Sequence, residues 1–312
     1  MQKYILKRLL LLIPILLGVT FIIFVAMELT PGDPVIRILG VEAEPEAVEQ
    51  LREQLGLDKP FLVRFFTYIR DVVFRFDFGI SWRTRQPVFN DLLPRIPATL
   101  KLALCGAALA AIIGIPLGVF SAVKQNSLAD NLARVFATVF VSMPGFWFAM
   151  LLVLLFTLRL KWFPAIADGS WKSLIMPVIA LGLPAGCRIM RMTRSTMLEC
   201  IREDYVRTAR AKGVPNRKVT YKHALQNALL PVINEVGATF KSMLGGSMVI
   251  ESVFSLPGVG SLTVLSIKSK DTMELLACVL MIAVTGTLVM LAVDIVYAYI
   301  DPRIKAKYTK KK

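Results

Sequence analysis

The chain has 312 residues, of which 55% are hydrophobic and 19% are charged, and its mean hydropathy is +0.62. This composition excludes a disordered chain, and the 4 Cys residues are too few and too scattered for a secreted disulfide scaffold. The formal net charge is +15, but no basic soluble surface accompanies it, so the charge does not indicate nucleic-acid binding. The remaining class is a membrane protein with an excess of basic residues.

Long runs without charged residues predict membrane-spanning helices, because a bilayer core about 30 Å thick requires roughly 20 apolar residues in a helix. Four runs qualify outright. Of two weaker runs, one contains Pro177 and Pro184, and the other is interrupted by Glu235 and Lys241. We therefore predict an all-α membrane protein, with a single transmembrane domain over residues 1–312. Its six spans are residues 9–29, 100–123, 135–158, 172–190, 228–250 and 275–298.

The first run has an alternative interpretation as a signal peptide, since Lys3, Lys7 and Arg8 give it a basic head. Its apolar stretch is longer than the usual signal core of about 7–15 residues. No small-x-small cleavage site follows before Pro31. We expect this segment to be retained as the first span.

The distribution of Lys and Arg over the short loops predicts the orientation. The N-terminus, loops 124–134 and 191–227 and the C-terminal tail carry most of these residues, whereas loops 159–172 and 251–274 carry few. By the positive-inside rule both termini are cytoplasmic, and the long first loop, residues 30–98, lies outside.

The outer segments contain further predicted helices. Val48–Leu55 and Phe61–Phe76 have amphipathic patterns and are expected to form an outer cap. Phe254–Lys270, with Pro257 and Gly258, is predicted to be a short outer helix or a re-entrant turn.

Two spans carry informative patterns. In the second span Gly106, Ala110, Gly114 and Gly118 recur every four residues, a stripe that permits close helix packing within the chain or at a subunit interface. In the fifth span Asn234, Ala238, Lys241 and Gly245 share one face, with Glu235 to the side.

A cation near the middle of a membrane costs about 2.5–3.5 kcal/mol on insertion scales. Lys241 is therefore expected to face a watery cavity or a partner acid, and Asn234, Glu235 and Lys241 are candidate residues of a translocation pathway. The alternative is that Lys241 snorkels or forms a structural pair.

The loop between the fourth and fifth spans has the pattern of a short exposed helix. Ten Lys and Arg residues lie within Arg188–Asn227, and Gly213 followed by Pro215 ends a predicted helix over Tyr205–Lys212. Its exposed face is expected to carry the small residues Thr208, Ala209 and Ala211 rather than large apolar ones. Such a face suits a protein groove better than a lipid surface.

This loop also resembles a known family, the permease subunits of ABC importers, in the branch that imports dipeptides, oligopeptides or nickel. That family carries a motif of Glu-Ala-Ala, three residues and Gly, followed by Leu-Pro. Here Arg207–Gly213 holds the motif, Arg207 replaces the Glu, and Leu230 and Pro231 close it. Further segments also resemble sequences of that branch of the family. They are Asp204–Gly213, His223–Val232, Leu29–Pro34, Asp77–Ser81, Pro97–Leu104, Ser142–Trp147, Leu244–Gly260 and Asp301–Ile304.

The resemblance implies a type I ABC importer fold with alternating access, located in the bacterial inner membrane. It implies as partners a second homologous permease, two ABC ATPase subunits and an extracytoplasmic substrate-binding protein, in addition to membrane lipids. The helix in the cytoplasmic loop would couple the chain to the ATPase. Its residues would be Tyr205, Arg207, Thr208, Ala209, Arg210, Ala211, Lys212, Gly213 and Pro215. The basic side chains among them would contact the ATPase or lipid phosphates, or simply follow the positive-inside rule.

The sequence predicts no catalytic, nucleotide-binding or metal-binding site in this chain. The sequence has no Gly-Lys dipeptide and so no P-loop, which assigns ATP and Mg to partner subunits and indicates a transducer rather than an enzyme. The single His, His223, is expected to be structural or solvated, and no Cys pair has metal-binding spacing. We expect no cofactor and no metal.

Three alternatives in function remain. For an importer, the first choice of cargo is a dipeptide or oligopeptide, and the second is nickel or a nickel chelate. A stand-alone channel or secondary transporter would require an inverted repeat and several intramembrane charges, which the sequence does not display. A structural or signalling subunit would require a soluble cytoplasmic domain.

Overall fold

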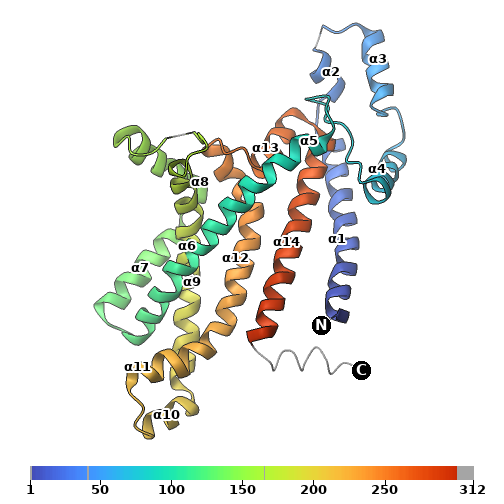
Figure 1. Cartoon of the computed structure of the whole chain (residues 1–312). Coiled ribbons are helices and arrows are strands. Elements are labelled where there is room, and N and C mark those ends of the chain that lie inside the picture. Colours follow the sequence, from blue (N-terminus) through green and yellow to red (C-terminus); the bar gives the residue numbers. More distant parts are fainter. Residues whose placement is uncertain (1, 41, 165, 301–312) are drawn as a thin grey trace. The chain divides into compact units, whose positions relative to one another are not determined.

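The computed structural model describes residues 2–40, 42–164 and 166–300, and helices dominate it (Figure 1). Within these ranges the one pairing of extended backbone is an isolated bridge between Ile80 and Pro87. The prediction of an all-α chain is confirmed. The motif segment Asp301–Ile304 and the basic C-terminal tail lie outside the described residues.

The helices follow one another in chain order with short connections. The first group is α1 (Gln2–Leu29), α2 (Pro34–Leu39), α3 (Pro45–Gln54), α4 (Phe61–Arg75), α5 (Val88–Leu92), η1 (Leu93–Arg95) and α6 (Ile96–Val123). The second group is α7 (Leu128–Ser142), α8 (Gly145–Leu152), the π-helical η2 (Val153–Arg159), α9 (Lys172–Arg202) and α10 (Asp204–Ala211). The third group is α11 (Asn216–Lys218), the π-helical η3 (Val219–Ala224), α12 (Leu225–Val253), α13 (Val259–Ser269) and α14 (Thr272–Ile300).

The chain divides into two compact units. Within the described residues, unit 1 comprises Leu100–Leu256 and Gly286 to Ile300, and unit 2 comprises Gln2–Thr99 and Pro257–Thr285. Helices α6 and α14 contribute residues to both units.

Four of the described helical segments are long and apolar enough to cross a membrane. They are Leu10–Leu29, Val88–Val123, Lys172–Arg202 and Thr272–Ile295, and each overlaps a predicted span. The helix at the fifth predicted span, α12, is continuous but does not meet the same criterion. Its crossing of the membrane therefore stays a prediction.

The third predicted span, residues 135–158, is a bent pair of helices in the structure and not one straight helix. Helix α7 ends at Ser142, α8 begins at Gly145, and the pair is bent by 102°. The cause is Pro144, which has no amide proton and disfavours the helical conformation of the preceding residue. Met143 accordingly has extended backbone, with φ −79° and ψ 127°.

The fourth predicted span also differs from the structure at its end. Helix α9 begins at Lys172 as predicted but runs for 31 residues to Arg202. Residues 191–202, which the charge pattern assigns to a loop, are thus a helical extension. Arg and Glu are good helix formers, so a positive charge cluster marks the end of an apolar span but not the end of its helix.

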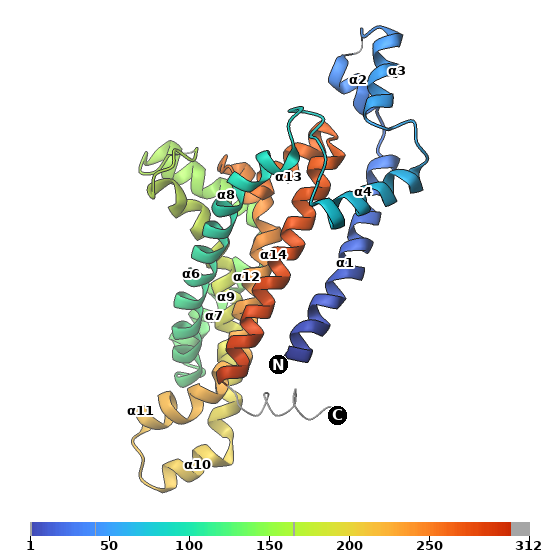
Figure 2. The same cartoon turned by 45° about the vertical axis from the view of Figure 1, so that its right-hand side comes forward.

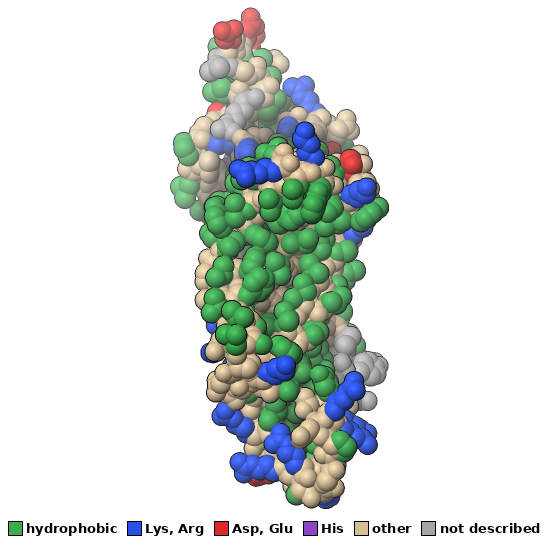
Figure 3. Space-filling model, turned by 90° about the vertical axis from the view of Figure 1, so that its left-hand side faces the viewer, with side chains coloured by type: hydrophobic (Ala, Val, Ile, Leu, Met, Phe, Trp, Pro, Cys, Tyr) green, Lys and Arg blue, Asp and Glu red, His purple; other side chains and the backbone are tan. Residues whose placement is uncertain are grey.

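In unit 1, α9 packs against α7, α8 and α12. The small-residue stripe of α6 lies against α9. A Cβ placed on Gly114 would be 2.5 Å from the Gly186 carbonyl oxygen, and one on Gly118 would be 2.5 Å from Thr193 Cβ. The stripe therefore serves packing within the chain. Hydrophobic side chains cover most of the middle of the face shown in Figure 3, as expected of a surface in contact with lipid.

In unit 2, α4 packs on α1 through aromatic rings. Phe65 and Tyr68 lie against Phe24, with ring centroids 5.6 Å apart in both pairs. The amphipathic helices predicted near residues 48–55 and 61–76 are confirmed as α3 and α4. The predicted short helix within residues 254–270 is confirmed as α13.

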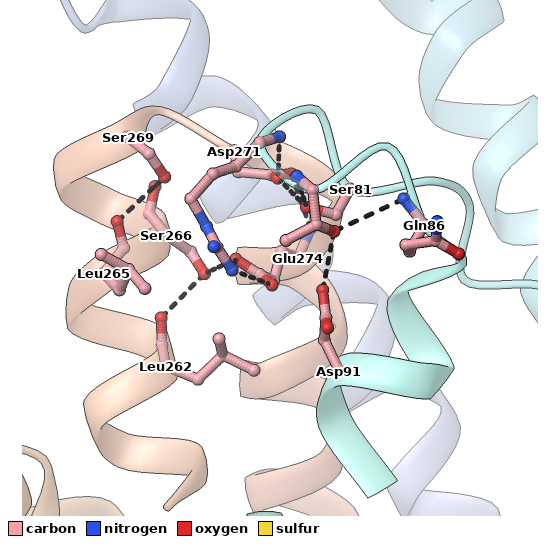
Figure 4. Close-up of polar contacts among 11 residues, drawn as sticks. Ser81, Gln86, Asp91, Leu262, Leu265, Ser266, Ser269, Asp271 and Glu274 are labelled. Atoms are coloured by element: carbon pink, nitrogen blue, oxygen red, sulfur yellow. Dashed lines mark hydrogen bonds and ion pairs between the residues drawn. The ribbon is translucent and has the colours of Figure 1, made fainter. Parts of the chain in front are cut away.

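A buried polar cluster in unit 2 joins the segment before α5 to the corner between α13 and α14 (Figure 4). Ser81 Oγ donates to Asp271 Oδ2 at 2.6 Å, and Ser266 Oγ donates to Glu274 Oε2 at 2.8 Å. Arg83 Nη2 lies 3.1 Å from Glu274 Oε1. Both carboxylates are fully buried, so these donors offset the cost of removing the charges from water.

Candidate functional site

Helix α10 is the candidate site, and its sequence explains its length. Glu203 has extended backbone and precedes Asp204, an acidic residue favoured in a first helical turn. Gly213 has φ +76°, a left-handed conformation that ends helices and that glycine adopts without strain. The observed Asp204–Ala211 thus begins and ends one residue before the predicted helix. In unit 1 it lies beyond the ends of α9 and α12 in both views (Figures 1 and 2).

The inner face of α10 is anchored in a hydrophobic cluster. Val206 and Ala209 are buried there and pack with Val119 of α6 and Met197 of α9. Further members of this cluster are Ala122, Val219, Ala224 and Ala228. The ends of α6, α9 and α12 therefore meet on one side of α10.

The prediction that Ala209 belongs to the exposed docking face is wrong, because Ala209 is only 8% exposed. Its position three residues after the fully buried Val206 places both on the same side of the helix. The covered face of so short a helix is not apparent from the sequence, since both faces carry small residues.

The outer face of α10 is polar and basic, and none of the residues that the structure describes covers it. Its exposed members are Tyr205, Arg207, Thr208, Arg210, Ala211, Lys212, Gly213 and Pro215. The Arg207 guanidinium lies 3.7 Å from the Asp204 carboxylate, and both side chains are largely exposed. Such a pair contributes little to stability, so these charges remain available to a partner.

Tyr205 differs from its exposed neighbours because part of it is covered. Burial raises the pKa of the Tyr205 phenol, and the nearby Cys200 thiol raises it further. The phenol is therefore neutral at physiological pH and can donate a hydrogen bond.

The candidate pathway residues lie on a second uncovered surface, along α12. Asn234 and Lys241 are exposed and Glu235 is half-buried. A Cβ added at Gly245 or Gly246 would meet nothing within 4 Å. The adjoining side of α12 is packed against α14: Gly237 lies so close to Val293 that an added Cβ would be 2.5 Å from Val293 Cγ1.

Sequence reasoning missed a buried ion pair near α10. Asp130 of α7 is fully buried and receives two hydrogen bonds from Arg194 of α9, each 2.8 Å long. One signal was present: Ser127 caps α7 by accepting from the Asp130 amide, and a Ser three residues before an acid is typical of a helix start. The partner on α9 could not be identified, because loop 188–227 offers many basic residues.

Among the residues that the structure describes, no group of three or more His, Cys, Asp or Glu side chains is arranged to hold a metal ion.

Similarity to known proteins identifies the family. Residues 114–306 match the family described as binding-protein-dependent transport system inner membrane component, and residues 1–103 match the N-terminal family of the same transport systems. The chain belongs to this family. It is therefore a permease component of an ABC importer and a multi-pass inner-membrane protein, not an enzyme.

Curated relatives match over nearly the whole chain. The dipeptide transport system permease protein DppB of Alkalihalophilus pseudofirmus is 40% identical over 333 residues, covering 98% of this chain and all of the relative. The glutathione transport system permease protein GsiC of Escherichia coli K12 is 39% identical over 307 residues, with the same coverage. The resemblance to the peptide branch of permeases is confirmed.

Solved structures share the fold at lower identity. A chain of the inward-facing MetNI methionine ABC transporter superposes with a TM-score of 0.58 at 19% identity, covering 67% of this chain and 96% of that chain. A chain of an amino acid ABC transporter with histidines has a TM-score of 0.50 at 18% identity, covering 69% and 94%. The fold is thus that of the membrane chains of ABC importers.

Proposed function

We propose that this chain forms half of the translocation pathway for dipeptides or oligopeptides and is driven by a partner ATPase that binds α10. One observation carries the proposal. The inner face of α10 is fixed to the ends of α6, α9 and α12, while its outer face presents small and basic residues. A rigid base and an uncovered outer surface are what a force-transmitting contact requires.

Energetics favour an external source of work. Moving a gate from 1:99 to 99:1 requires about 5.5 kcal/mol of differential binding. The sequence contains no P-loop lysine motif with which to bind nucleotide phosphates. ATP and Mg would therefore bind to two partner ATPase subunits, and this chain needs no cofactor of its own.

The cargo proposal rests on the relatives. The two permeases described above are named for dipeptide and glutathione transport, and both match 98% of this chain. Peptide is thus preferred over nickel chelate. Along the pathway, the uncovered face of α12 with Asn234, Glu235 and Lys241 would face the cavity formed with a second permease.

The proposed topology has six spans and cytoplasmic termini. The bent pair α7–α8 would be the third span and α12 the fifth, and the loop between α9 and α12 would be cytoplasmic, in agreement with its positive charge. The outer loop 30–98 would then receive the substrate-binding protein.

Reconstitution tests the proposal. Proteoliposomes containing this chain, its partner permease and the ATPase subunits should take up labelled dipeptide only when ATP and the binding protein are present. Liposomes with this chain alone should take up none. Uptake by the chain alone, without ATP, would show that it is a secondary transporter or channel. ATP-driven uptake of nickel chelate but not of peptide would show that the cargo is nickel chelate.

A further inference from the structure

Asp130 of unit 1 has a carboxylate that accepts hydrogen bonds from three other residues. It lies on α7, just after the turn that follows α6, and its side chain is fully buried. Arg194 Nε donates to Oδ1 and Arg194 Nη2 to Oδ2, each at 2.8 Å. Ser121 of α6 donates to Oδ1, and the Asn126 amide of the turn donates to Oδ2 at 2.9 Å. Three elements thus converge on one carboxylate: the end of α6, the α6–α7 turn and α9.

The geometry of this pair fixes an orientation as well as a distance. A two-pronged arginine–carboxylate pair holds both groups in one plane, which a single hydrogen bond or an apolar contact does not. The nearby Arg134 is 3.8 Å from Oδ1 and about half exposed, so it contributes charge but no comparable constraint. By contrast, the contact of α6 with α9 at Gly118 and Thr193 is close but apolar. The ion pair therefore resists sliding of α9 past the α6–α7 turn.

The pair lies on the route between α10 and the rest of unit 1. Arg194 is about two turns before the end of α9, and α10 begins two residues after that end. The cluster beneath α10 includes Val119 of α6 and Met197 of α9, which flank the ion pair in the sequence. Two of the helices that carry α10, α6 and α9, are thus also joined to each other through Asp130.

We propose that Asp130 and Arg194 are positioning residues for energy coupling. They hold α7 to α6 and α9, so that a displacement of α10 moves α7 together with the helices that α10 contacts directly. This inference rests on the proposed function of α10 as the ATPase contact. Neither residue touches ATP or cargo; they act through α10 and the helices that it moves.

The experiment uses the complete reconstituted transporter with Asp130→Asn and Arg194→Lys. Asp130→Asn keeps the shape but replaces one acceptor oxygen with a donor amide, and Arg194→Lys keeps the charge but loses the two-pronged geometry. Ser127→Ala is the matched control, because it removes the cap that accepts from the Asp130 amide but leaves both side chains of the ion pair in place. The measured quantities are ATP hydrolysed per dipeptide imported and the amount of ATPase subunit that co-purifies.

For Asp130→Asn, ATP hydrolysed per dipeptide should rise at least about fivefold, the lower end of typical coupling between sites. Arg194→Lys should give a smaller rise, while Ser127→Ala stays at the wild-type ratio and all variants retain the ATPase. Import and hydrolysis falling together, at an unchanged ratio, would overturn the inference and leave the pair a fold-stabilising contact. If Asp130→Asn is not recovered from the membrane, Arg194→Lys decides by the same criterion. Loss of the proposed function itself would be distinguishable, because the ATPase would then fail to co-purify with the wild-type chain.

Discussion

The packing of α6 on α9 permits a quantitative test with one methyl group. In Gly114→Ala the new Cβ would lie 2.5 Å from the Gly186 carbonyl oxygen and 2.8 Å from Ile189 Cβ, whereas ordinary contacts are 3.4–4 Å. The two helices must therefore separate by about 1 Å, and overpacking of this kind costs about 1–3 kcal/mol. Gly245→Ala is the matched control, since nothing lies within 4 Å of its added Cβ.

Both substitutions gain the same helix propensity, up to about 1 kcal/mol for Gly to Ala, so this contribution cancels in the comparison. Gly114→Ala should accordingly be less stable than Gly245→Ala by about 1–3 kcal/mol. The assay is denaturant unfolding of the purified chain in detergent micelles, followed by helical circular dichroism. Equal stability of the two variants would refute the close α6–α9 contact.

The remaining predictions concern the two uncovered surfaces. Gly213→Val should lower ATPase-coupled uptake, because a β-branched residue is strained at φ +76° by about 1–3 kcal/mol. Asn tolerates this conformation, so Gly213→Asn should retain most uptake in the same transport assay. If both variants retain uptake, the assignment of the helix end at Gly213 is contradicted. Lys241→Met keeps the methylene chain that passes Gly286 but removes the charge, and it should change the relative rates of dipeptide and tripeptide uptake; an unaltered profile would assign Lys241 a packing role.

Much of the fold was predictable because apolar run length and turn chemistry are local properties. Helices α1, α6, α9 and α14 follow from such runs, and α10 was located to within one residue from Gly213 and the acidic residues before it. The bend after Ser142 was also encoded locally, in Pro144. It was missed because the composition of the run is uniformly apolar on both sides of that proline.

What the sequence could not supply is which faces are covered. Ala209 looks like its neighbours on α10, and only the cluster formed by α6, α9 and α12 distinguishes it as buried. The same holds for Asp130, whose partner Arg194 is 64 residues away. In unit 2, Ser81 and Asp271 are separated by 190 residues. Such pairings depend on tertiary structure and leave no periodic trace in the chain.

The central claim, that the outer face of α10 contacts the ATPase, is tested most directly by site-specific crosslinking in the assembled transporter. A photoreactive residue replaces Thr208, which is exposed on α10, and in a separate variant replaces Leu154, which is exposed on η2. The account predicts a crosslink to the ATPase subunit from position 208, with a yield that changes on ATP binding, and none from position 154. Absence of any ATPase crosslink from position 208, in an assembly that transports peptide, would contradict it.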